Sequence, residues 1–426
     1  MAALASAFLL FWIEPLFTRL VLPLLGGSPA VWNTCLMYFQ SLLLIGYLYA
    51  HGSTRYLSVR QQIILHMSLL AVAFVALPIA LPAGWTPPPS SNVIPWLLKA
   101  LTVSVGAPFV ILSATAPLLQ RWLAGLDEPI ENPYALYAAS NAGSFIGLLA
   151  FPIVFEPNFT LGQQSRIWSV VYGAAVVLVG ACCDMVWRRT SRGRVPAAAR
   201  ADEGQSPEWS LRLKWVALAF VPSSLLLSVT TFLSTDVAAT PLLWVIPLSI
   251  YLLTFVVVFS RMGNAIRVPA AFLHAALISI LAMVVFWQAT IGLRWSYALN
   301  LGEFALTALV LHGELAASRP APLRLTGFYL WMALGGALGG AFTALVVPMI
   351  FRSTRDYFLM LVIACFLRPS ARRTITPHQA AIAQIESLVL RVAILMVGQP
   401  VERCPCIDDG GKQARRRLAG GEAGNE

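Results

Sequence analysis

The chain alternates between long hydrophobic runs and short polar interruptions that contain glycine, proline or charge. A helix needs about 20 apolar residues to cross the ~30 Å hydrocarbon core of a bilayer. The pattern therefore predicts a bundle of about 11–12 membrane spans, bounded by residues at which helices commonly end. The predicted spans lie near 4–25, 31–50, 62–82, 96–119, 134–155, 166–187, 213–235, 240–260, 268–287, 295–312 and 327–350, and a short twelfth segment at 357–367 spans only if its neighbours extend it.

Composition agrees with this pattern. Of the 426 residues, 58% are hydrophobic and only 11% are charged, and the mean hydropathy is +0.73. A soluble globular protein is nearer a quarter charged, so we expect an all-α, polytopic membrane protein whose main partner is the lipid bilayer. The net charge of +10 does not indicate a nucleic-acid partner, because the basic residues occur in short loops and the tail.

The loop charges predict an orientation. Cytoplasmic loops carry an excess of Lys and Arg, so an N-terminus inside the cell fits this chain best. No Lys or Arg precedes the first apolar run, and we expect no cleavable secretory signal. The loops expected inside contain Arg55, Arg60, Arg121, Arg188, Arg189, Arg192, Arg194, Arg200, Arg212, Lys214, Arg261, Arg267, Arg319 and Arg324; the opposite side has Lys99, Arg166, Arg294, Arg352 and Arg355, with Arg19 if it reaches outward.

The longest polar interruption, 188–212, divides the spans into two groups. We predict an N-terminal six-helix half at 1–187, a basic cytoplasmic linker at 188–212 and a second membrane half at 213–369. The remaining 370–426 reads as a cytoplasmic tail. Within it, 380–397 has apolar residues at helical spacing and is predicted to be an amphipathic surface helix, and the part after it is predicted to be disordered.

The two halves are similar to each other in sequence. Ser28-Pro29-Ala30-Val31-Trp32 opens the second span and Thr240-Pro241-Leu242-Leu243-Trp244 opens the eighth. The fifth span ends in Phe151-Pro152-Ile153-Val154-Phe155 and the eleventh in Val347-Pro348-Met349-Ile350-Phe351, with Gly143 matching Gly339. Chance likeness between apolar segments is the alternative. A parallel duplication of six helices resembles the 6+6 architecture of the major facilitator type.

Glu14 is the leading candidate for a functional residue. It lies near the middle of the first span, where a carboxylate costs several kcal/mol unless it is paired, protonated or facing a polar cavity. Pro15 has no N–H and frees backbone carbonyls near it. A cation or proton site is the functional interpretation, and a structural pair with Arg19 or another polar partner is the alternative, although five residues separate the two by about 140° around a helix.

The fifth span carries Tyr134, Tyr137, Asn141 and Ser144 on one face. Such a stripe faces either a cavity or a neighbouring helix through interhelical hydrogen bonds, and the sequence favours neither. The Gly335-Gly336 and Gly339-Gly340 pairs of the eleventh span form overlapping G-x-x-x-G patterns, which predict close helix packing.

Further charged or titratable residues lie in the second half. We expect Glu303 near the outer end of the tenth span and His312 and Glu314 at its inner end, while Asp236 caps the seventh span. Interfacial positions predict a solvated or capping role for Asp236, His312 and Glu314. His274 stands alone in the ninth span and is more typical of a satisfied core residue than of a ligand.

No pattern points to a metal, a cofactor or catalysis. Cys35, Cys182, Cys183 and Cys365 lie in apolar segments and resemble small buried hydrophobes. Cys404 and Cys406 form a lone C-x-C without the second ligand pair of a zinc site. There is no Ser–His–Asp spacing and no phosphate-binding loop, so we expect neither cofactor nor enzymatic activity.

Several motifs resemble, in order, a bacterial family of fused major-facilitator/spermidine-synthase-like membrane proteins. They run from Leu4 to about Pro369. The resemblance implies a multi-pass protein of the bacterial inner membrane; family members continue into a cytoplasmic aminopropyltransferase-like domain, and nothing after Pro369 resembles that domain. The motifs are Phe8-Leu9-Leu10-Phe11, Glu14-Pro15-Leu16, Gly26 to Cys35, Gly46 to His51, Ala116-Pro117-Leu118-Leu119-Gln120, Tyr137 to Asn141, Phe220 to Leu225, Pro241-Leu242-Leu243-Trp244, His312-Gly313-Glu314-Leu315 and Phe328-Tyr329-Leu330-Trp331-Met332.

Two functions follow from these observations. The first is transport of a small cationic solute such as a polyamine, with Glu14 as its binding group. The second is a non-catalytic membrane anchor or regulator of a separately encoded cytoplasmic aminopropyltransferase. An aminopropyl-transferring enzyme in its own right would need the dinucleotide-type glycine turn and acidic residue that this chain lacks.

Overall fold

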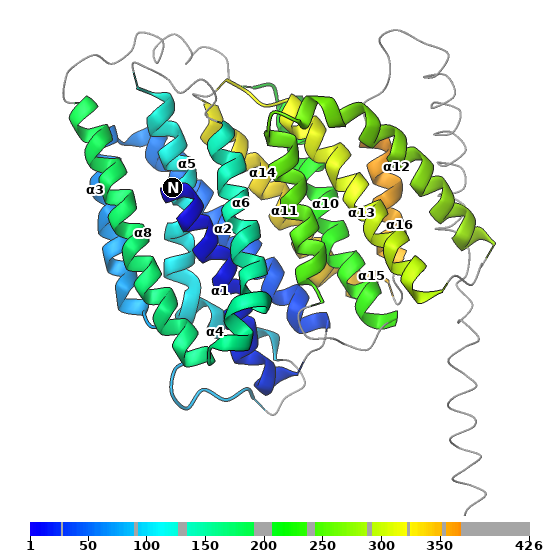
Figure 1. Cartoon of the computed structure of the whole chain (residues 1–426), viewed down its shortest axis with the longest axis horizontal. Helices are drawn as coiled ribbons and strands as arrows, with labels where there is room; N and C mark the ends of the chain where they lie inside the picture. The colour runs from blue at the N-terminus through cyan, green and yellow to red at the C-terminus, as the bar shows by residue number, and fades with distance from the viewer. Residues whose placement is uncertain are drawn as a thin grey trace, which may run out of the picture.

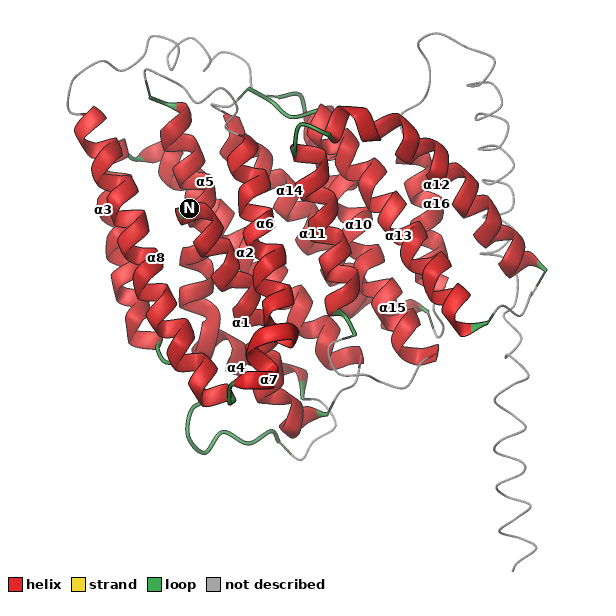
Figure 2. Ribbon diagram, viewed as in Figure 1, coloured by secondary structure: helices red, strands yellow, loops and turns green. Residues whose placement is uncertain are grey.

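The computed structural model describes residues 1–26, 29–88, 93–126, 134–190, 207–236, 243–287, 292–321, 324–351 and 355–367. Within these ranges the regular structure is entirely helical, and the long helices run side by side (Figure 2). The linker residues 191–206 and the tail, including the predicted amphipathic helix and the C-x-C pair, lie outside the described part.

The first half contains six long helical segments that run the length of the bundle. Three of them include a short 3-10 or π-helical stretch. The elements are α1 (Ala2–Leu25), α2 (Pro29–Tyr56), α3 (Val59–Val72) with η1 (Ala73–Ala76), α4 (Ile94–Leu101) with η2 (Thr102–Gly106) and α5 (Ala107–Ala124), α6 (Tyr134–Ala150) with η3 (Phe151–Phe155) and α7 (Glu156–Asn158), and α8 (Leu161–Thr190).

The second half repeats this order. Its elements are α10 (Trp209–Asp236), α11 (Val245–Phe259), α12 (Gly263–Phe286), α13 (Leu293–Ala317), α14 (Leu325–Ala341) with η6 (Phe342–Val346) and α15 (Val347–Ile350), and α16 (Arg355–Leu367).

Among the described residues, 9 helical segments are long and apolar enough to cross a membrane, and α11 and α16 are shorter apolar helices. The remaining rod, α13, has the length of a span but carries Arg294, Glu303 and Glu314. The predicted all-α bundle of about 11–12 spans is therefore confirmed. The last helix, α16, has 13 residues and rises only about 20 Å, so it remains the shortest of the set.

The contacts between helices repeat in the two halves. In the first half α1 packs on α5, α6 and α8, and in the second α10 packs in the same way on α13, α14 and α16. Between the halves, α2 packs on α14 while α6 packs on α11, an exchange that relates the halves by a twofold operation. One hydrophobic core lies within the first half, and a second, mostly within the second half, also includes Trp32, Leu36, Tyr137 and Leu148 of the first. The helices of the two halves lie side by side in Figure 1. This is the 6+6 repeat predicted from the sequence.

Glycines make the equivalent crossing in each half possible. A Cβ at Gly143 of α6 would overlap the carbonyl oxygen of Leu4 in α1, and Gly147 meets the next turn of α1 in the same way. In the second half, Gly335 and Gly339 of α14 lie against backbone carbonyls of α10. The G-x-x-x-G pattern of the eleventh span is thus a packing motif, as predicted.

The two ends of the bundle differ in charge. We call the end where α8 finishes and α10 begins the linker end; it is uppermost in Figure 1. The element order places the loop arginines after α2, α5, α11 and α13 at this end. Which side of the membrane the linker end faces stays a prediction from the positive-inside rule.

Candidate functional site

A cavity lies between the two halves, at the centre of the bundle. Its volume is about 130 Å³, enough for several water molecules or a small solute. The walls come from α1, α2, α5 and α6 of the first half and from α10, α11 and α14 of the second. Most of the lining is apolar or aromatic, so each polar group in it stands out.

Glu14 lines this cavity. Glu14 is 5% exposed. Among the residues that the structure describes, no cation pairs with its carboxyl. The carboxyl therefore lies at membrane depth, inside protein and next to open space. Pro15 cannot donate to the carbonyl of Phe11, which lines the same cavity, so an acceptor without its usual helical donor lies one turn from the carboxyl.

Arg19 is not the partner of Glu14. Its Nε lies 2.6 Å from a carboxylate oxygen of Glu156 in α7, and both side chains are partly exposed. The alternative in which Arg19 neutralises Glu14 is wrong, because the two point in different directions around α1, as a separation of about 140° requires. Arg19 and Glu156 instead join α1 to the end of the η3 segment, at the end of the bundle opposite the linker.

The polar stripe of α6 faces the cavity. Tyr137, Asn141 and Ser144 line it, together with Ser140 from the same helix. The Asn141 amide donates to the carbonyl of Tyr137 at 2.9 Å, and the Tyr137 hydroxyl approaches the sulfur of Met332 in α14 at 3.6 Å. Tyr134 begins α6, but its side chain lies outside the described set.

Sequence reasoning missed further polar residues of the lining, among them three with large side chains. Gln40 and Tyr47 come from α2, and Tyr251 comes from α11. The amide oxygen of Gln40 has no hydrogen-bond partner and lies against Gly340 of α14. A glutamine within an apolar run was the available signal, because an amide in hydrocarbon needs a partner or a cavity just as a carboxylate does.

Contacts between the halves close the cavity at its linker end. The rings of Tyr137 and Tyr329 stack with centroids 4.7 Å apart, and the Tyr329 hydroxyl donates to the amide oxygen of Gln120 in α5 at 2.7 Å. Nearer the ends of the helices, His51 of α2 lies 3.2 Å from the hydroxyl of Thr326 in α14. All of these contacts are made by side chains.

A second set of contacts closes the opposite end. Trp32 of α2 and Trp244 of α11 pack beneath Glu14 with ring centroids 6.0 Å apart. The Asn33 amide donates to the hydroxyl of Thr231 in α10 at 3.0 Å. Contacts between the halves therefore lie on both sides of the cavity, toward the linker end and toward the opposite end.

The other charged candidates lie away from the cavity. Glu303 is fully buried and lies near the middle of α13 rather than at its outer end; its carboxylate contacts His274 at 3.1 Å and accepts from Thr307 at 3.2 Å. The pairing explains why His274 can be buried in its own helix. Asp236 is the last residue of α10, and its side chain is not among those that the structure describes.

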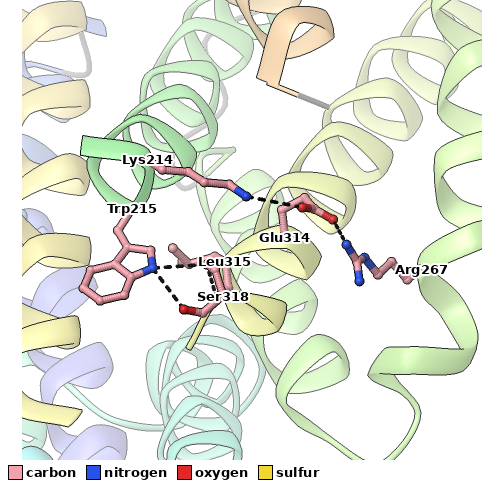
Figure 3. A network of polar contacts seen from close by, with 6 residues as sticks. All are labelled: Lys214, Trp215, Arg267, Glu314, Leu315 and Ser318. Carbon is pink, nitrogen blue, oxygen red and sulfur yellow. Dashed lines mark hydrogen bonds and ion pairs between the residues drawn. The ribbon is translucent and has the colours of Figure 1, made fainter. Parts of the chain in front are cut away.

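The expectation that His312 and Glu314 are solvated is wrong. His312 is fully buried and bonds the hydroxyl of Thr254 at 2.7 Å. Glu314 is 6% exposed and contacts two cations, Arg267 of α12 and Lys214 of α10, the latter at 3.7 Å (Figure 3). These side chains point toward neighbouring helices because α13 is surrounded by α10, α11 and α12.

No cluster of His, Cys, Asp and Glu among the described residues could hold a metal ion. Cys35, Cys182, Cys183 and Cys365 lie within helices and form no disulfide with one another.

Comparison with solved structures identifies the fold. The chain is similar to the proton:xylose symporter XylE of the major facilitator superfamily, solved with 6-bromo-6-deoxy-D-glucose (14% identity, 86% of this chain and 93% of that chain covered, TM-score 0.54). It is also similar to a bacterial homologue of the iron transporter ferroportin in its outward-facing state (14% identity, 92% and 98% covered, TM-score 0.50). At this identity the likeness shows the fold alone, and that fold is of the major facilitator type.

No protein-family model and no curated protein matches the chain. These two searches therefore give no support to the resemblance to fused spermidine-synthase-like proteins, and the solved structures support only its major-facilitator-like fold.

Proposed function

We propose that this integral membrane protein transports a small cationic solute through the cavity between its two halves. The observation that carries the proposal is Glu14, a carboxyl without a paired cation among the described residues, which lines a cavity between the two halves. The fold alone does not distinguish a transporter from a membrane anchor. The unpaired acid favours a transporter, because an anchor has no use for an uncompensated carboxyl at bilayer depth.

The lining suits an amine. A solute ammonium next to Glu14 would supply the missing positive charge, and its N–H groups could donate to the carboxylate and to the Phe11 carbonyl. The faces of aromatic rings attract cations, and Tyr47, Tyr251 and Phe255 are part of the wall.

The number of acidic residues in the cavity lining restricts the class of substrate. Glu14 is the only acidic residue among those that line the cavity, so one ammonium gains a direct partner. A polyamine carries further ammonium groups, each of which would have to leave water without a counter-charge. The polyamine suggested by the sequence motifs is therefore a less good fit to the lining than a monoamine, and the assay should compare both.

The contacts of Tyr329 at the linker end and the Trp32–Trp244 contact at the opposite end could open in turn during a transport cycle. Opening the Tyr329 side would admit solute from the linker end, and opening the Trp32–Trp244 side would release it at the other. Each closure consists of side-chain contacts between halves, so one can separate while the other holds. We further propose that the linker end faces the cytoplasm of a bacterial cell, which reporter fusions at residues 195 and 290 would test.

The deciding experiment measures uptake of a labelled monoamine and of labelled spermidine into proteoliposomes. Glu14→Gln keeps the shape of the side chain and removes its charge; we expect uptake to fall to the level of empty liposomes. Asp184→Asn is the matched control, because this acid is exposed on α8 and bonds only Arg188 in the structure described. Undiminished uptake by the Glu14 variant would remove this residue from the mechanism.

The anchor hypothesis rests on the sequence motifs and makes the opposite prediction. It expects no uptake of any amine by the wild-type protein and co-purification with a soluble aminopropyltransferase. Uptake that depends on Glu14 would exclude it as the sole function.

A further inference from the structure

A second pocket lies at the linker end, outside the central cavity. Its volume is about 420 Å³, and it is formed where α11 ends, α12 begins and α13 ends. It shares no lining residue with the central cavity. Its lining is mainly polar, whereas the surrounding helices are apolar, so it is a distinct site that the proposed transport does not use.

Three arginines line this pocket: Arg261, Arg267 and Arg319. No acidic residue is part of the lining. The nearest acid in the described contacts is Glu314, one turn inward on α13, and it contacts both Arg267 and Lys214 (Figure 3). One carboxylate thus faces two cations, and Arg261 adds a further positive charge to the described lining, so these groups together are net positive.

The backbone adds to this charge. The 24-residue helix α12 starts at Gly263 in the pocket wall, and the N-terminus of a helix carries a partial positive charge. A side chain at Gly263 would overlap the carbonyl oxygen of Val258, so the tight turn between α11 and α12 requires glycine there. The side chain of Asn264 offers a further amide to a bound anion.

The pocket continues into an apolar surface. Below it, α12 lies at the edge of the bundle (Figure 1). Its outer face carries Val268, Phe272 and Leu273, with exposed fractions of 77%, 56% and 53%. A basic pocket next to an exposed apolar helix face fits a molecule that has an anionic headgroup and hydrocarbon chains.

We propose that this pocket binds the phosphate headgroup of an anionic phospholipid, whose acyl chains lie along the outer face of α12. The arginines hold the phosphate by bidentate hydrogen bonds, for which the guanidinium fork is suited. Because Arg267 also contacts Glu314, the lipid would be coupled to the contact that joins α12 to α13.

Native mass spectrometry of the detergent-purified, full-length chain tests this proposal. The protein is titrated with phosphatidylglycerol and, separately, with phosphatidylcholine. We expect phosphatidylglycerol to bind more tightly. Each basic side chain near an anionic headgroup contributes about fivefold in binding, so Arg261→Gln with Arg319→Gln should weaken phosphatidylglycerol binding roughly 25-fold and leave phosphatidylcholine unchanged.

The matched control is Arg189→Gln, which removes an exposed arginine at the same end of the bundle, on α8. The single variant Arg261→Gln, which alters an exposed side chain, serves if the double variant unfolds, with an expected loss of about fivefold. Equal losses in the pocket variants and the control, or no loss in either, would overturn the site. Displacement of the lipid by inorganic phosphate at millimolar concentration would overturn the lipid assignment in favour of a soluble anion.

Discussion

Two adjacent glycines of α14 should respond to alanine with opposite sign. At Gly335 a Cβ would overlap the carbonyl oxygen of Val216 in α10 and lie 2.9 Å from the Cβ of Ala219. At Gly336 a Cβ would meet no atom within 4 Å, since this residue faces the central cavity. Both positions are helical, so alanine gains about 1 kcal/mol of helix propensity at each.

The difference comes from packing. An ordinary Cβ contact begins near 3.4 Å, so Gly335→Ala has to move Ala219 by about 0.5 Å and the Val216 backbone by more. Overpacking of this kind costs about 1–3 kcal/mol, and a backbone carbonyl cannot rotate away as a flexible side chain can. We therefore expect Gly335→Ala to lower the free energy of unfolding by up to about 2 kcal/mol, and Gly336→Ala to raise it by about 0.5–1 kcal/mol.

The assay is thermal unfolding in detergent, followed by tryptophan fluorescence, with the two variants and the wild type at equal concentration. Gly143→Ala, at the equivalent crossing of α6 over α1, should repeat the loss seen at Gly335. Equal midpoints for the Gly335 and Gly336 variants would refute the reasoning, because helix propensity alone treats the two positions alike.

Three further predictions concern the closures and the buried acid of the second half. A thiol-specific cross-linker joining cysteines placed at Trp32 and Trp244 should stop uptake, with recovery on cleavage; continued uptake while linked would count against the opposing closure. Tyr329→Phe removes a buried hydrogen bond to Gln120 worth about 1–3 kcal/mol, so a cysteine introduced in the cavity should label faster from the linker end, and unchanged labelling would contradict this. Glu303→Ala should lower the free energy of unfolding by about 2–5 kcal/mol, since it empties a fully buried site; an unshifted unfolding midpoint would show that the buried contact contributes little.

The helices could be predicted because hydropathy depends on local sequence alone. The repeat could be predicted because related glycine and proline segments occur in both halves. Its register was predicted wrongly by one helical turn: at the crossing with the first helix of its half, Gly143 corresponds to Gly335, and Gly147 corresponds to Gly339. Glu14 was found because a carboxylate in an apolar run is costly wherever it points.

The pairings could not be predicted in the same way. Arg19 and Glu156 are distant in sequence, as are Gln120 and Tyr329, and each pair depends on how whole helices are placed. His312 shows the same limit, because its depth was judged from distance to a span end, whereas its burial comes from the ring of Phe255 stacked on it at 3.8 Å. Position along one helix says little about which side of it is covered.

The glycine crossings have a consequence for how the polypeptide is put together. Backbone meets backbone at these crossings inside each group of six helices, whereas the contacts described between the two groups each involve a side chain, as where Gln40 lies against Gly340. Two fragments made as separate polypeptides, 1–190 and 207–426, should each fold around their own glycine crossings and then associate in the bilayer. The covalent connection would then serve to keep equal numbers of the two fragments together, and their shapes would not depend on it.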